Sequence, residues 1–325
     1  MSSIYSHSRI TALKRCERFH YYKVYGSAGG WKRDAPPGAR QAYTLSKLET
    51  VHMRLGTSLH SAATRIASAI RAGEPIPSHD ELLAFVRSEL NRVWLSSRDR
   101  DAFLDNPGAN PCYQHMYYDE EMPREEIERF QQRIQRSVHN LVNAEVWNQV
   151  RAADPSDIII RPQFDSIEFE DVTVYSTIDL MYGVRRNGSL EYTILDWKLQ
   201  SDSAAMDQVA QYAWFALQSG FAPEFNGECR GQIVRLNDGM DYAIDITMDD
   251  IREAEVRLRA GLANLSRFVI GGDLAANIPL PKQHFALRPN TQHCRFCQFY
   301  EMCAPDIEQA SYKGPFDPEG DHTNA

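Results

Sequence analysis

The stretch TIDLMYGVRRNGSLEYTILDWKLQ, residues 177–200, decides which fold the chain is expected to adopt. Two runs rich in β-branched and aromatic residues are joined by RRNG, a turn sequence typical of a β-hairpin. Asp179 ends or nearly ends the first strand, and the second strand carries Asp196 and Lys198. Successive side chains point to opposite faces of a strand, so Asp196 and Lys198 share one face and Trp197 lies on the other. The hairpin is expected to bring Asp179 alongside.

Two carboxylates facing a lysine suit a divalent cation such as Mg2+, which prefers oxygen ligands. The cation would stabilise charge on a phosphate, and the lysine could orient or activate the attacking water. The alternative is a salt bridge without a catalytic role, which is the more common meaning of an isolated D-x-K pattern. Both aspartates follow apolar runs, YSTI and YTIL, where a charge is costly unless it is paired or bound to a metal. On the predicted helix that follows, Gln208 and Tyr212 lie one turn apart on the same face.

Helical and strand-like patterns alternate along the chain and predict an α/β fold. Helical periodicity marks residues 9–25, 56–73, 124–150, 204–220 and 248–270. Strand patterns mark residues 157–164, 172–184, 190–199, 229–236 and 241–246. We expect a central mixed sheet flanked by helices, in one domain over residues 1–304 with an α/β core at about 155–250. A helical insertion is expected at about 74–150, including a surface segment at 96–126, and a loose tail at 305–325.

The bulk composition is that of an ordinary globular protein. The chain has 325 residues and a formal charge of -9, which argues against a generic polyanion-binding protein but not against a local basic groove. No run of about 18 apolar residues predicts a membrane span, and the N-terminal sequence lacks the apolar core of a signal peptide. We therefore expect a cytoplasmic protein whose six cysteines are metal ligands or core residues rather than disulfides.

Three cysteines lie close together near the C-terminus, in QHCRFCQFYEMC. Cys294, Cys297 and Cys303 have the spacing C-x2-C-x5-C, which is typical of a metal site that lacks one ligand. Zinc accepts four thiolates, although its structural sites usually pair two short knuckles, and an iron–sulfur cluster also needs four. His284 and His293 are alternative ligands nearby. A lone distant cysteine that completed the triplet would join the two ends of the chain.

Three other features have both a functional and a structural explanation. His60 is expected in the first turn of the helix at 56–73, where an isolated histidine is more often a helix-end residue than a ligand. The basic–aromatic run KRCERFHYYKVY could line a channel for single-stranded DNA or form an amphipathic helix with a solvated basic face. The helix at 124–150 is expected to expose its charged face and pack through an apolar stripe. GSAGGWK lacks the G-K-[ST] of a P-loop, and no helicase motor is expected.

Taken in order, the motifs resemble those of the RecB-like branch of the PD-(D/E)XK nuclease superfamily. The matching segments are GTSLH for G-x-x-x-H, STID for G-x-x-D, DWK for D-x-K and a Q-x-x-x-Y pattern on the next helix. They supply, in this order, His60, Asp179, Asp196, Lys198, Gln208 and Tyr212. The sequence departs from the pattern at Ser176, where the family usually has Gly, and at Glu17, where Pro is common. The resemblance implies a restriction-endonuclease-like core.

The resemblance also implies metal-dependent cleavage of DNA phosphodiesters, by an exonuclease acting on DNA ends or single strands. It assigns Mg2+ or Mn2+ to His60, Asp179, Asp196 and the backbone carbonyl of Trp197. Lys198 would assist the nucleophilic water. Gln208 and Tyr212 would support the site or contact the DNA strand. The alternative is a non-catalytic DNA-binding or adaptor protein of the same fold.

The cysteine spacing resembles the iron staple of a subset of these nucleases, which includes CRISPR-adaptation nucleases and AddB-type helicase–nuclease subunits. In that subset one cysteine precedes the nuclease motifs and C-x2-C-x5-C follows them, so Cys16 takes the first position. The resemblance favours a structural [4Fe-4S] cluster on Cys16, Cys294, Cys297 and Cys303 over zinc. DNA is the implied partner, with helicase or CRISPR-adaptation proteins as further candidates. Repair, CRISPR adaptation and phage DNA processing all remain open as pathways.

Overall fold

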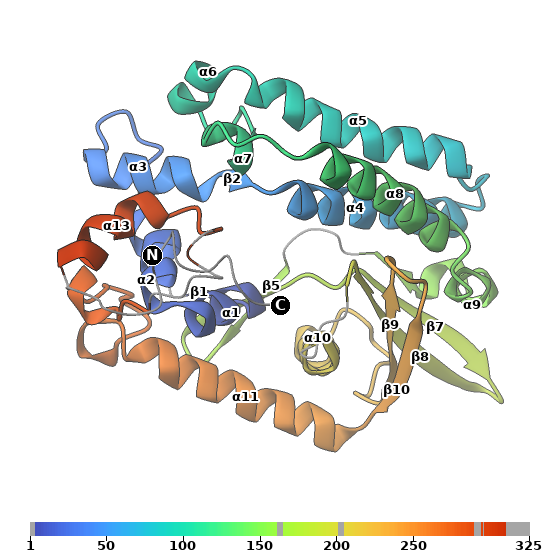
Figure 1. Cartoon of the computed structure of the whole chain (residues 1–325). Helices are drawn as coiled ribbons and strands as arrows, with labels where there is room; N and C mark the ends of the chain where they lie inside the picture. The colour runs from blue at the N-terminus through green and yellow to red at the C-terminus, as the bar shows by residue number, and fades with distance from the viewer. Residues whose placement is uncertain (1–3, 161–164, 201–204, 289–293, 295, 310–325) are drawn as a thin grey trace, which may run out of the picture. The chain divides into compact units, whose positions relative to one another are not determined.

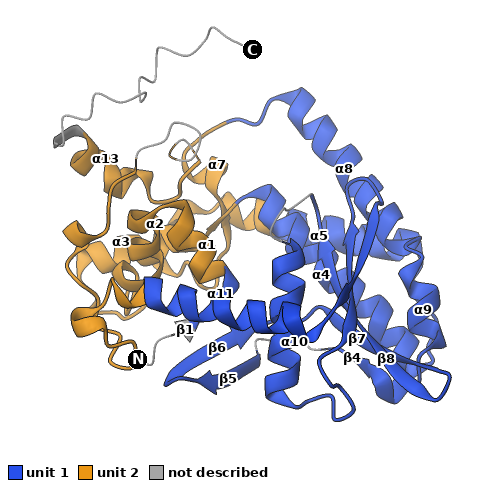
Figure 2. Cartoon of the chain, turned by 90° about the horizontal axis from the view of Figure 1, so that it is seen from below, with its two compact units in different colours: residues 1–7, 50–92, 121–264 blue, residues 8–49, 93–120, 265–325 orange. Residues whose placement is uncertain are grey.

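The computed structural model describes residues 4–160, 165–200, 205–288, 294 and 296–309. The chain forms two compact units, which Figure 2 colours separately. Unit 1 comprises residues 1–7, 50–92 and 121–264, and unit 2 comprises residues 8–49, 93–120 and 265–325. All the residues of the nuclease motifs belong to unit 1, whereas the four candidate cluster cysteines belong to unit 2. Each candidate site therefore lies within one unit.

A five-stranded mixed sheet forms the centre of unit 1 (Figure 1). Its strand order is β10 (Asp241–Ile246), β9 (Cys229–Arg235), β8 (Ser189–Lys198), β7 (Leu180–Arg186) and β4 (Ile158–Ile159). β8 and β9 run parallel, and the other neighbours are antiparallel. The predicted hairpin turn joins β7 to β8, with φ of 51° at Asn187 and 85° at Gly188, as such a two-residue turn requires. The predicted α/β class and mixed sheet are confirmed.

The strand predicted at residues 172–184 is two strands in two different sheets. β6 (Val172–Ser176) pairs with β1 (Ile4–Tyr5) and β5 (Asp165–Phe169) in a three-stranded sheet, whereas β7 pairs with β8 and β4. A strand has only two edges, so the change of partners ends β6 and begins β7. Asp179 lies in the crossing, immediately before β7, and begins a strand rather than ending one.

Unit 1 also contains helices and one 3-10 turn. They are α4 (Val51–Ala72), α5 (His79–Ser97, which continues into unit 2), α8 (Arg124–Val142), α9 (Val146–Ala152), the 3-10 turn η2 (Pro155–Asp157), α10 (Ala205–Ser219) and α11 (Met248–Ser266, also shared). Thr50 caps α4 by accepting a hydrogen bond from the Met53 N–H, and Gly73 ends it with a φ of 67°. The helix thus begins earlier than predicted, and His60 lies in its third turn. The helix predicted at 124–150 is interrupted between α8 and α9.

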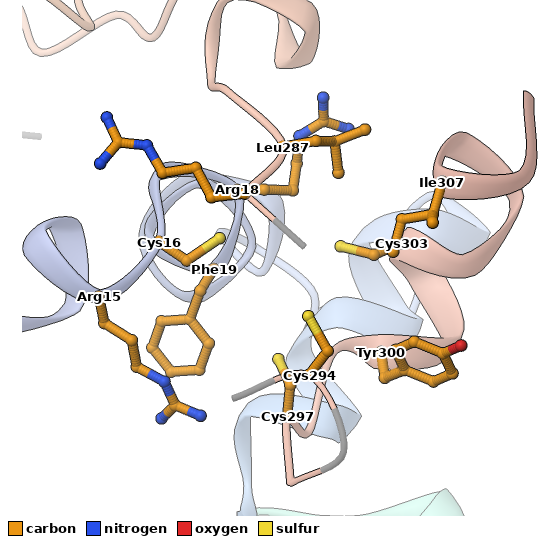
Figure 3. Close-up of a pocket in the computed structure, with 11 residues that line it drawn as sticks. Arg15, Cys16, Arg18, Phe19, Leu287, Cys294, Cys297, Tyr300, Cys303 and Ile307 are labelled. Carbon is orange, nitrogen blue, oxygen red and sulfur yellow. The ribbon is translucent and has the colours of Figure 1, made fainter. Parts of the chain in front are cut away.

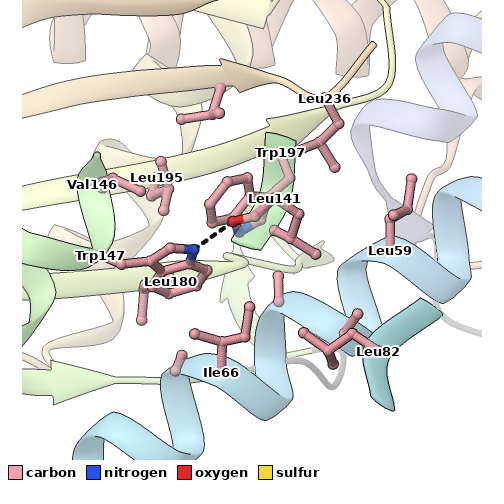
Figure 4. Close-up of a cluster of buried hydrophobic side chains, with 14 of the residues drawn as sticks. Leu59, Ile66, Leu82, Leu141, Val146, Trp147, Leu180, Leu195, Trp197 and Leu236 are labelled. Carbon is pink, nitrogen blue, oxygen red and sulfur yellow. Dashed lines mark hydrogen bonds between the residues drawn. The ribbon is translucent and has the colours of Figure 1, made fainter. Parts of the chain in front are cut away.

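The core of unit 1 lies between one face of the sheet and α4, α8 and α9 (Figure 4). Trp147 on α9 stacks on Trp197 of β8 with ring centroids 5.1 Å apart, and its indole N–H donates to the Leu141 carbonyl at 2.7 Å. Leu180 and Leu195, paired across β7 and β8, belong to the same cluster. Because Trp197 is buried here, its neighbours on β8 face the opposite side of the sheet, as predicted.

Helix α10 covers that opposite side, next to β8 and β9 (Figure 1). Gly231 on β9 makes the close approach possible, because a Cβ there would lie 2.8 Å from Val209 Cγ1. Gln208 precedes Val209 on α10, so this packing sets the distance between Gln208 and β8.

Unit 2 is mainly helical. It contains α1 (His7–Arg15), α2 (Glu17–Tyr21), the π-helical turn η1 (Tyr22–Gly26), α3 (Pro37–Ser46), β2 (Leu48–Glu49), α6 (Arg100–Asp105), β3 (Cys112–Tyr113), α7 (Gln114–Tyr117), the 3-10 turns η3 (Ile270–Gly272) and η4 (Lys282–His284), and α13 (Tyr300–Gln309). The single helix predicted at 9–25 is wrong, because Cys16 is extended (φ −166°, ψ 126°) and separates α1 from α2. The helical periodicity continues across this break, so the sequence pattern alone did not reveal it.

Two further expectations about the chain need correction. The segment at 96–126 is not purely a surface insertion, because Phe103 and Cys112 are fully buried in the core of unit 2. The first residues of the predicted tail are helical, since α13 continues to Gln309, and residues 310–325 lie outside the described residues. Within the described part of the chain, no helix is long and apolar enough to cross a membrane.

Candidate active site and cysteine cavity

The structure brings the residues of all four motifs together in unit 1. His60 comes from α4 and Asp179 from the start of β7. Asp196 and Lys198 come from the end of β8, and α10 supplies Gln208 and Tyr212. Hydrogen bonds and one ion pair connect these side chains into two groups, one around Asp179 and one around Lys198.

The first group centres on Asp179. Its Oδ1 lies 2.8 Å from His60 Nδ1, and its Oδ2 accepts the Trp197 backbone N–H at 3.1 Å. Burial lowers the pKa of His60, but the charge and hydrogen bond of Asp179 and the charge of Asp196 together outweigh it, so the pKa lies above its usual value. The N–H and C=O of one strand residue face the same edge, so the Trp197 carbonyl also faces the Asp179 side of β8. Ser176, at the position where the family usually has Gly, lies in β6 and has no positive φ, so its backbone conformation does not require glycine.

The second group centres on Lys198. Its ammonium lies 2.8 Å from Asp196 Oδ2 and donates a hydrogen bond to Gln208 Oε1 at 2.6 Å. The Gln208 amide in turn donates to the Tyr212 hydroxyl. The lysine is therefore held at one end of a short polar chain that continues onto α10.

Asp196 is the most perturbed group of the site. Its side chain is 2% exposed, and burial raises the pKa of Asp196 to about 7, with a further contribution from the charge of Asp179. Oδ2 accepts no hydrogen bond of normal geometry from any described residue, in spite of its proximity to Lys198. Burial and the two carboxylates also raise the pKa of Tyr212 well above its usual value, so its hydroxyl stays protonated.

The predicted metal ligands are adjacent but are not arranged around a common centre. In the described parts of the chain, no group of three or more His, Cys, Asp or Glu side chains is placed to hold a metal ion. His60 and Asp179 are hydrogen-bonded to each other, and Asp196 is paired with Lys198. The buried Asp196 Oδ2 has the Lys198 ammonium at 2.8 Å but no hydrogen bond of normal geometry, so its remaining acceptor capacity fits a cation ligand. The metal assignment stays a prediction.

The four candidate cluster cysteines line one cavity in unit 2. Cys16 lies between α1 and α2, Cys294 and Cys297 precede α13, and Cys303 lies on α13. Figure 3 shows their sulfur atoms pointing into a common space. Burial raises the pKa of Cys297 to about 11 and that of Cys303 to about 12, with the neighbouring thiols adding to the rise. Ionising these thiols therefore requires a nearby cation.

The two alternative histidine ligands differ in what can be said of them. His284 is not among the described residues that line this cavity, and His293 lies outside the described residues. Three arginines that the sequence interpretation missed do line the cavity: Arg15, Arg18 and Arg288. Arg15 and Arg18 lie within two residues of Cys16 in the sequence. Basic residues so close to a predicted ligand could have indicated that arginines line its site.

Direct contacts connect the segment around Cys16 to the C-terminal segment. Arg18 forms an ion pair with Asp306 on α13. Glu17, at the position where the family commonly has Pro, accepts hydrogen bonds from the Ala286 N–H at 2.8 Å and from Arg288 at 2.6 Å. The Phe19 ring packs edge-on against Phe299, with centroids 5.3 Å apart.

The aromatic run around Cys16 is largely structural. Phe19 and Tyr22 are 7% and 3% exposed, so neither offers a free face on which a base could stack. Arg18 is buried and already paired. For these residues the structure favours the structural explanation over a channel for single-stranded DNA.

The comparison with protein families agrees with this arrangement. A family model described as the PD-(D/E)XK nuclease superfamily matches residues 4–304. No curated protein matches the chain. The matched range includes the five-stranded sheet, every motif residue and all four cysteines of the cavity. The chain belongs to the PD-(D/E)XK nuclease superfamily.

Proposed function

We propose that the chain is a metal-dependent deoxyribonuclease of the RecB-like branch, acting on DNA ends or single strands. The observation that carries the proposal is the convergence of His60, Asp179, Asp196 and Lys198 at one place in unit 1. Charged groups at the ends of buried strands are costly unless they perform a function or find a partner.

His60, Asp179, Asp196 and the Trp197 carbonyl would hold Mg2+ or Mn2+. When bound, such a cation stabilises negative charge on a phosphate and makes a coordinated water a better nucleophile. Carboxylate oxygens and a single imidazole are a ligand set that suits these metals. The Asp196 oxygen without a normal hydrogen bond is the strongest support for this assignment.

Lys198 is placed to assist the nucleophile. Its ammonium has three protons; Gln208 accepts one, and Asp196 lies within ion-pair distance. The remaining donor capacity can orient a water or neutralise a phosphate oxygen. Gln208 and Tyr212 are positioning residues in this proposal, because they hold the lysine rather than the reacting atoms.

For the cysteine cavity we propose a structural [4Fe-4S] cluster, with zinc as the alternative. A cluster or a zinc ion bound by four thiolates carries net negative charge, and three arginines line the cavity, of which Arg18 and Arg288 are already paired with Asp306 and Glu17. None of the six cysteines forms a disulfide in the structure, which suits a reducing compartment such as the cytoplasm. The cluster would add a covalent connection to the contacts that already join α2 and α13.

The test of the nuclease is a digestion assay with end-labelled single- and double-stranded DNA, with and without Mn2+. Lys198→Ala and Asp196→Ala should each reduce cleavage at least about 100-fold, whereas the exposed Lys32→Ala is the control and should cleave normally. Label released as mononucleotides from the ends indicates an exonuclease. Undiminished cleavage by both variants would refute the assignment.

The cluster has its own test, which does not depend on cleavage. Anaerobically purified protein should be coloured and contain iron and acid-labile sulfide, and Cys303→Ser should lose both. Cys229→Ser, which changes a thiol on β9 in unit 1, is the matched control and should retain iron. A colourless protein loaded with zinc would decide for the alternative metal.

A further inference from the structure

A basic groove lies along α8 in unit 1, and none of the motif residues lines it. Its cavity has a volume of about 470 Å³ and is lined by Arg129, Arg133 and Arg136 together with His52 and Asn237. The three arginines follow the spacing i, i+4 and i+7, which places them on one face of the helix. The charged face of this helix was expected to be merely solvated. Instead, its arginines line a cavity together with His52 of α4 and Asn237.

The arginines of this groove have neutral partners. Arg133 Nε and Arg136 Nη2 donate to the same Asn237 Oδ1, at 3.3 and 3.0 Å. Arg133 Nη1 lies 3.3 Å from His52 Nδ1. Within the described residues none of the three arginines forms an ion pair, and the groove contains a single carboxylate, that of Glu126. The positive charge of the groove is therefore not balanced from within.

Holding these charges together has an energetic cost. Burial lowers the pKa of Arg133, and the neighbouring charge of Arg136 lowers it further. Each guanidinium has five N–H donors, and the contacts to Asn237 and His52 use only a few of them. A phosphate would offset the repulsion and accept the remaining donors in the forked geometry that arginine favours.

The groove lies close to the candidate active site. Asn237 follows β9 directly after Leu236, whose N–H donates to the Lys198 carbonyl at 2.7 Å. On α4, His52 precedes His60 by eight residues, a distance of about 12 Å at 1.5 Å per residue. A DNA strand bound at the candidate site can therefore reach the groove within a few nucleotides.

We propose that Arg129, Arg133 and Arg136, with His52 and Asn237, bind backbone phosphates of the substrate strand a few nucleotides from the bond that is cleaved. The inference rests on the proposed nuclease function for the identity of its ligand. The groove would fix the path and register of the strand without reading its sequence, because contacts to phosphate carry no base information.

The test measures DNA binding separately from cleavage. A fluorescent single-stranded oligonucleotide is titrated without divalent metal at salt concentrations from about 50 to 200 mM, where phosphate contacts dominate the salt dependence. The full-length Lys198→Ala protein serves as the parent, so that cleavage cannot interfere. Adding Arg133→Gln and Arg136→Gln removes two contacts and should lower the slope of log Kd against log salt by about 1.4, at about 0.7 per contact.

The matched control is the pair Arg252→Gln and Arg257→Gln on α11. These arginines are already paired with Asp249 and Glu253, so the control should leave the salt slope unchanged. Arg136→Glu is a second variant at an exposed position that is not expected to affect folding, and it should weaken binding further. In the cleavage-competent protein, Arg133→Gln with Arg136→Gln should raise KM and leave kcat nearly unchanged.

The outcomes separate this inference from the nuclease proposal. Reduced salt dependence in the arginine variants supports the groove, even when wild-type protein shows no cleavage. An unchanged slope and affinity in a protein that does cleave DNA overturns the groove and leaves the nuclease standing. Absence of any DNA binding, or equal losses in the α11 control, also overturns it and would point to a protein ligand or to general charge.

Discussion

His60 Nδ1 lies 2.8 Å from Asp179 Oδ1, a contact that joins side chains 119 positions apart in the sequence. The other Asp179 oxygen accepts the Trp197 N–H, so both oxygens of this carboxylate have partners. Asp196 has an oxygen without a normal hydrogen bond, although its side chain is almost completely buried. The two carboxylates are therefore unequal. Both oxygens of Asp179 have hydrogen-bond partners, whereas Asp196 has only the ion pair with Lys198, and its pKa stays raised to about 7 beside that lysine.

This inequality predicts opposite effects of two similar substitutions on the ion-free protein. Asp196→Asn removes a buried charge that is unfavourable even beside Lys198, as its pKa of about 7 indicates, and should raise the free energy of unfolding at pH 8 by about 1 to 3 kcal/mol. Asp179→Asn weakens the acceptor for His60 and Trp197 and should lower the free energy of unfolding by about 1 to 2 kcal/mol. Urea denaturation of both variants in the presence of a chelator measures the difference.

The same variants respond differently to metal. Wild-type protein should gain thermal stability when Mn2+ is added, because an ion that binds only the folded state stabilises it. Asp196→Asn should lose this gain, since it lacks the carboxylate that the ion is expected to bind. An Asn variant that is less stable than wild type without metal, or that keeps the full Mn2+ response, would contradict the role given to Asp196.

The raised pKa of Asp196, about 7, predicts how the ion-free protein responds to pH. The unfolded chain ionises this carboxyl near 3.8, whereas the folded chain keeps it protonated up to about 7. The contribution of Asp196 to the free energy of unfolding is therefore fully present below pH 3.8, and it is lost as the pH rises through about 7. The pKa of His60 is also raised, so its contribution declines in the same direction.

Metal binding should show the reverse pH dependence, because the ligands must lose their protons first. Mn2+ affinity and the cleavage rate should both rise between about pH 6 and 8, with a limiting slope of about tenfold per pH unit for each proton released. Calorimetric titration in buffers of different ionisation enthalpy would also detect the released proton. Affinity that does not change across this range would show that Asp196 is already ionised in the ion-free protein.

The hydrogen bond between Lys198 and Gln208 predicts a positioning role for the amide. Gln208→Leu removes the acceptor at 2.6 Å and should lower kcat by about 10- to 100-fold, with Mn2+ affinity nearly unchanged. Gln208→Glu keeps an acceptor for the ammonium and should retain more activity than Gln208→Leu. Tyr212→Phe removes only the partner of the Gln208 amide and should have a smaller effect, about threefold to tenfold. Equal losses of kcat and Mn2+ affinity in Gln208→Leu would indicate a structural role instead.

The sequence revealed those parts of the site that depend on local patterns. The Asn187–Gly188 turn has residues that favour positive φ, so the hairpin and the alternation of Asp196 with Trp197 could be predicted. The break at Cys16 could not be predicted, because helical periodicity continues through it. The same is true of the crossing between β6 and β7, where strand-forming residues continue but the pairing partners change.

The contacts between distant elements were not accessible from the sequence. Motif order implied that Gln208 would lie near Lys198, but their hydrogen bond depends on how closely α10 approaches the sheet. The groove along α8 was missed for a similar reason. Arginines on an amphipathic helix face look solvated until the turn carrying Asn237 is placed beside them.

The packing of α10 against Gly231 on β9 leads to a prediction about both stability and cleavage. A Cβ at this position would lie 2.8 Å from Val209 Cγ1, and valine is too short and stiff to move aside easily. Gly231→Ala should therefore push α10 outward, destabilise the protein by about 1 to 3 kcal/mol, and reduce cleavage by displacing Gln208. Val209→Ala should restore the space, so the double variant should recover much of the cleavage rate that Gly231→Ala loses. A coupling energy of about 0.5 to 2 kcal/mol in the double-mutant cycle is the expected signature. Additive effects on stability, with cleavage no better in the double variant, would show that the approach of α10 to β9 does not position Gln208.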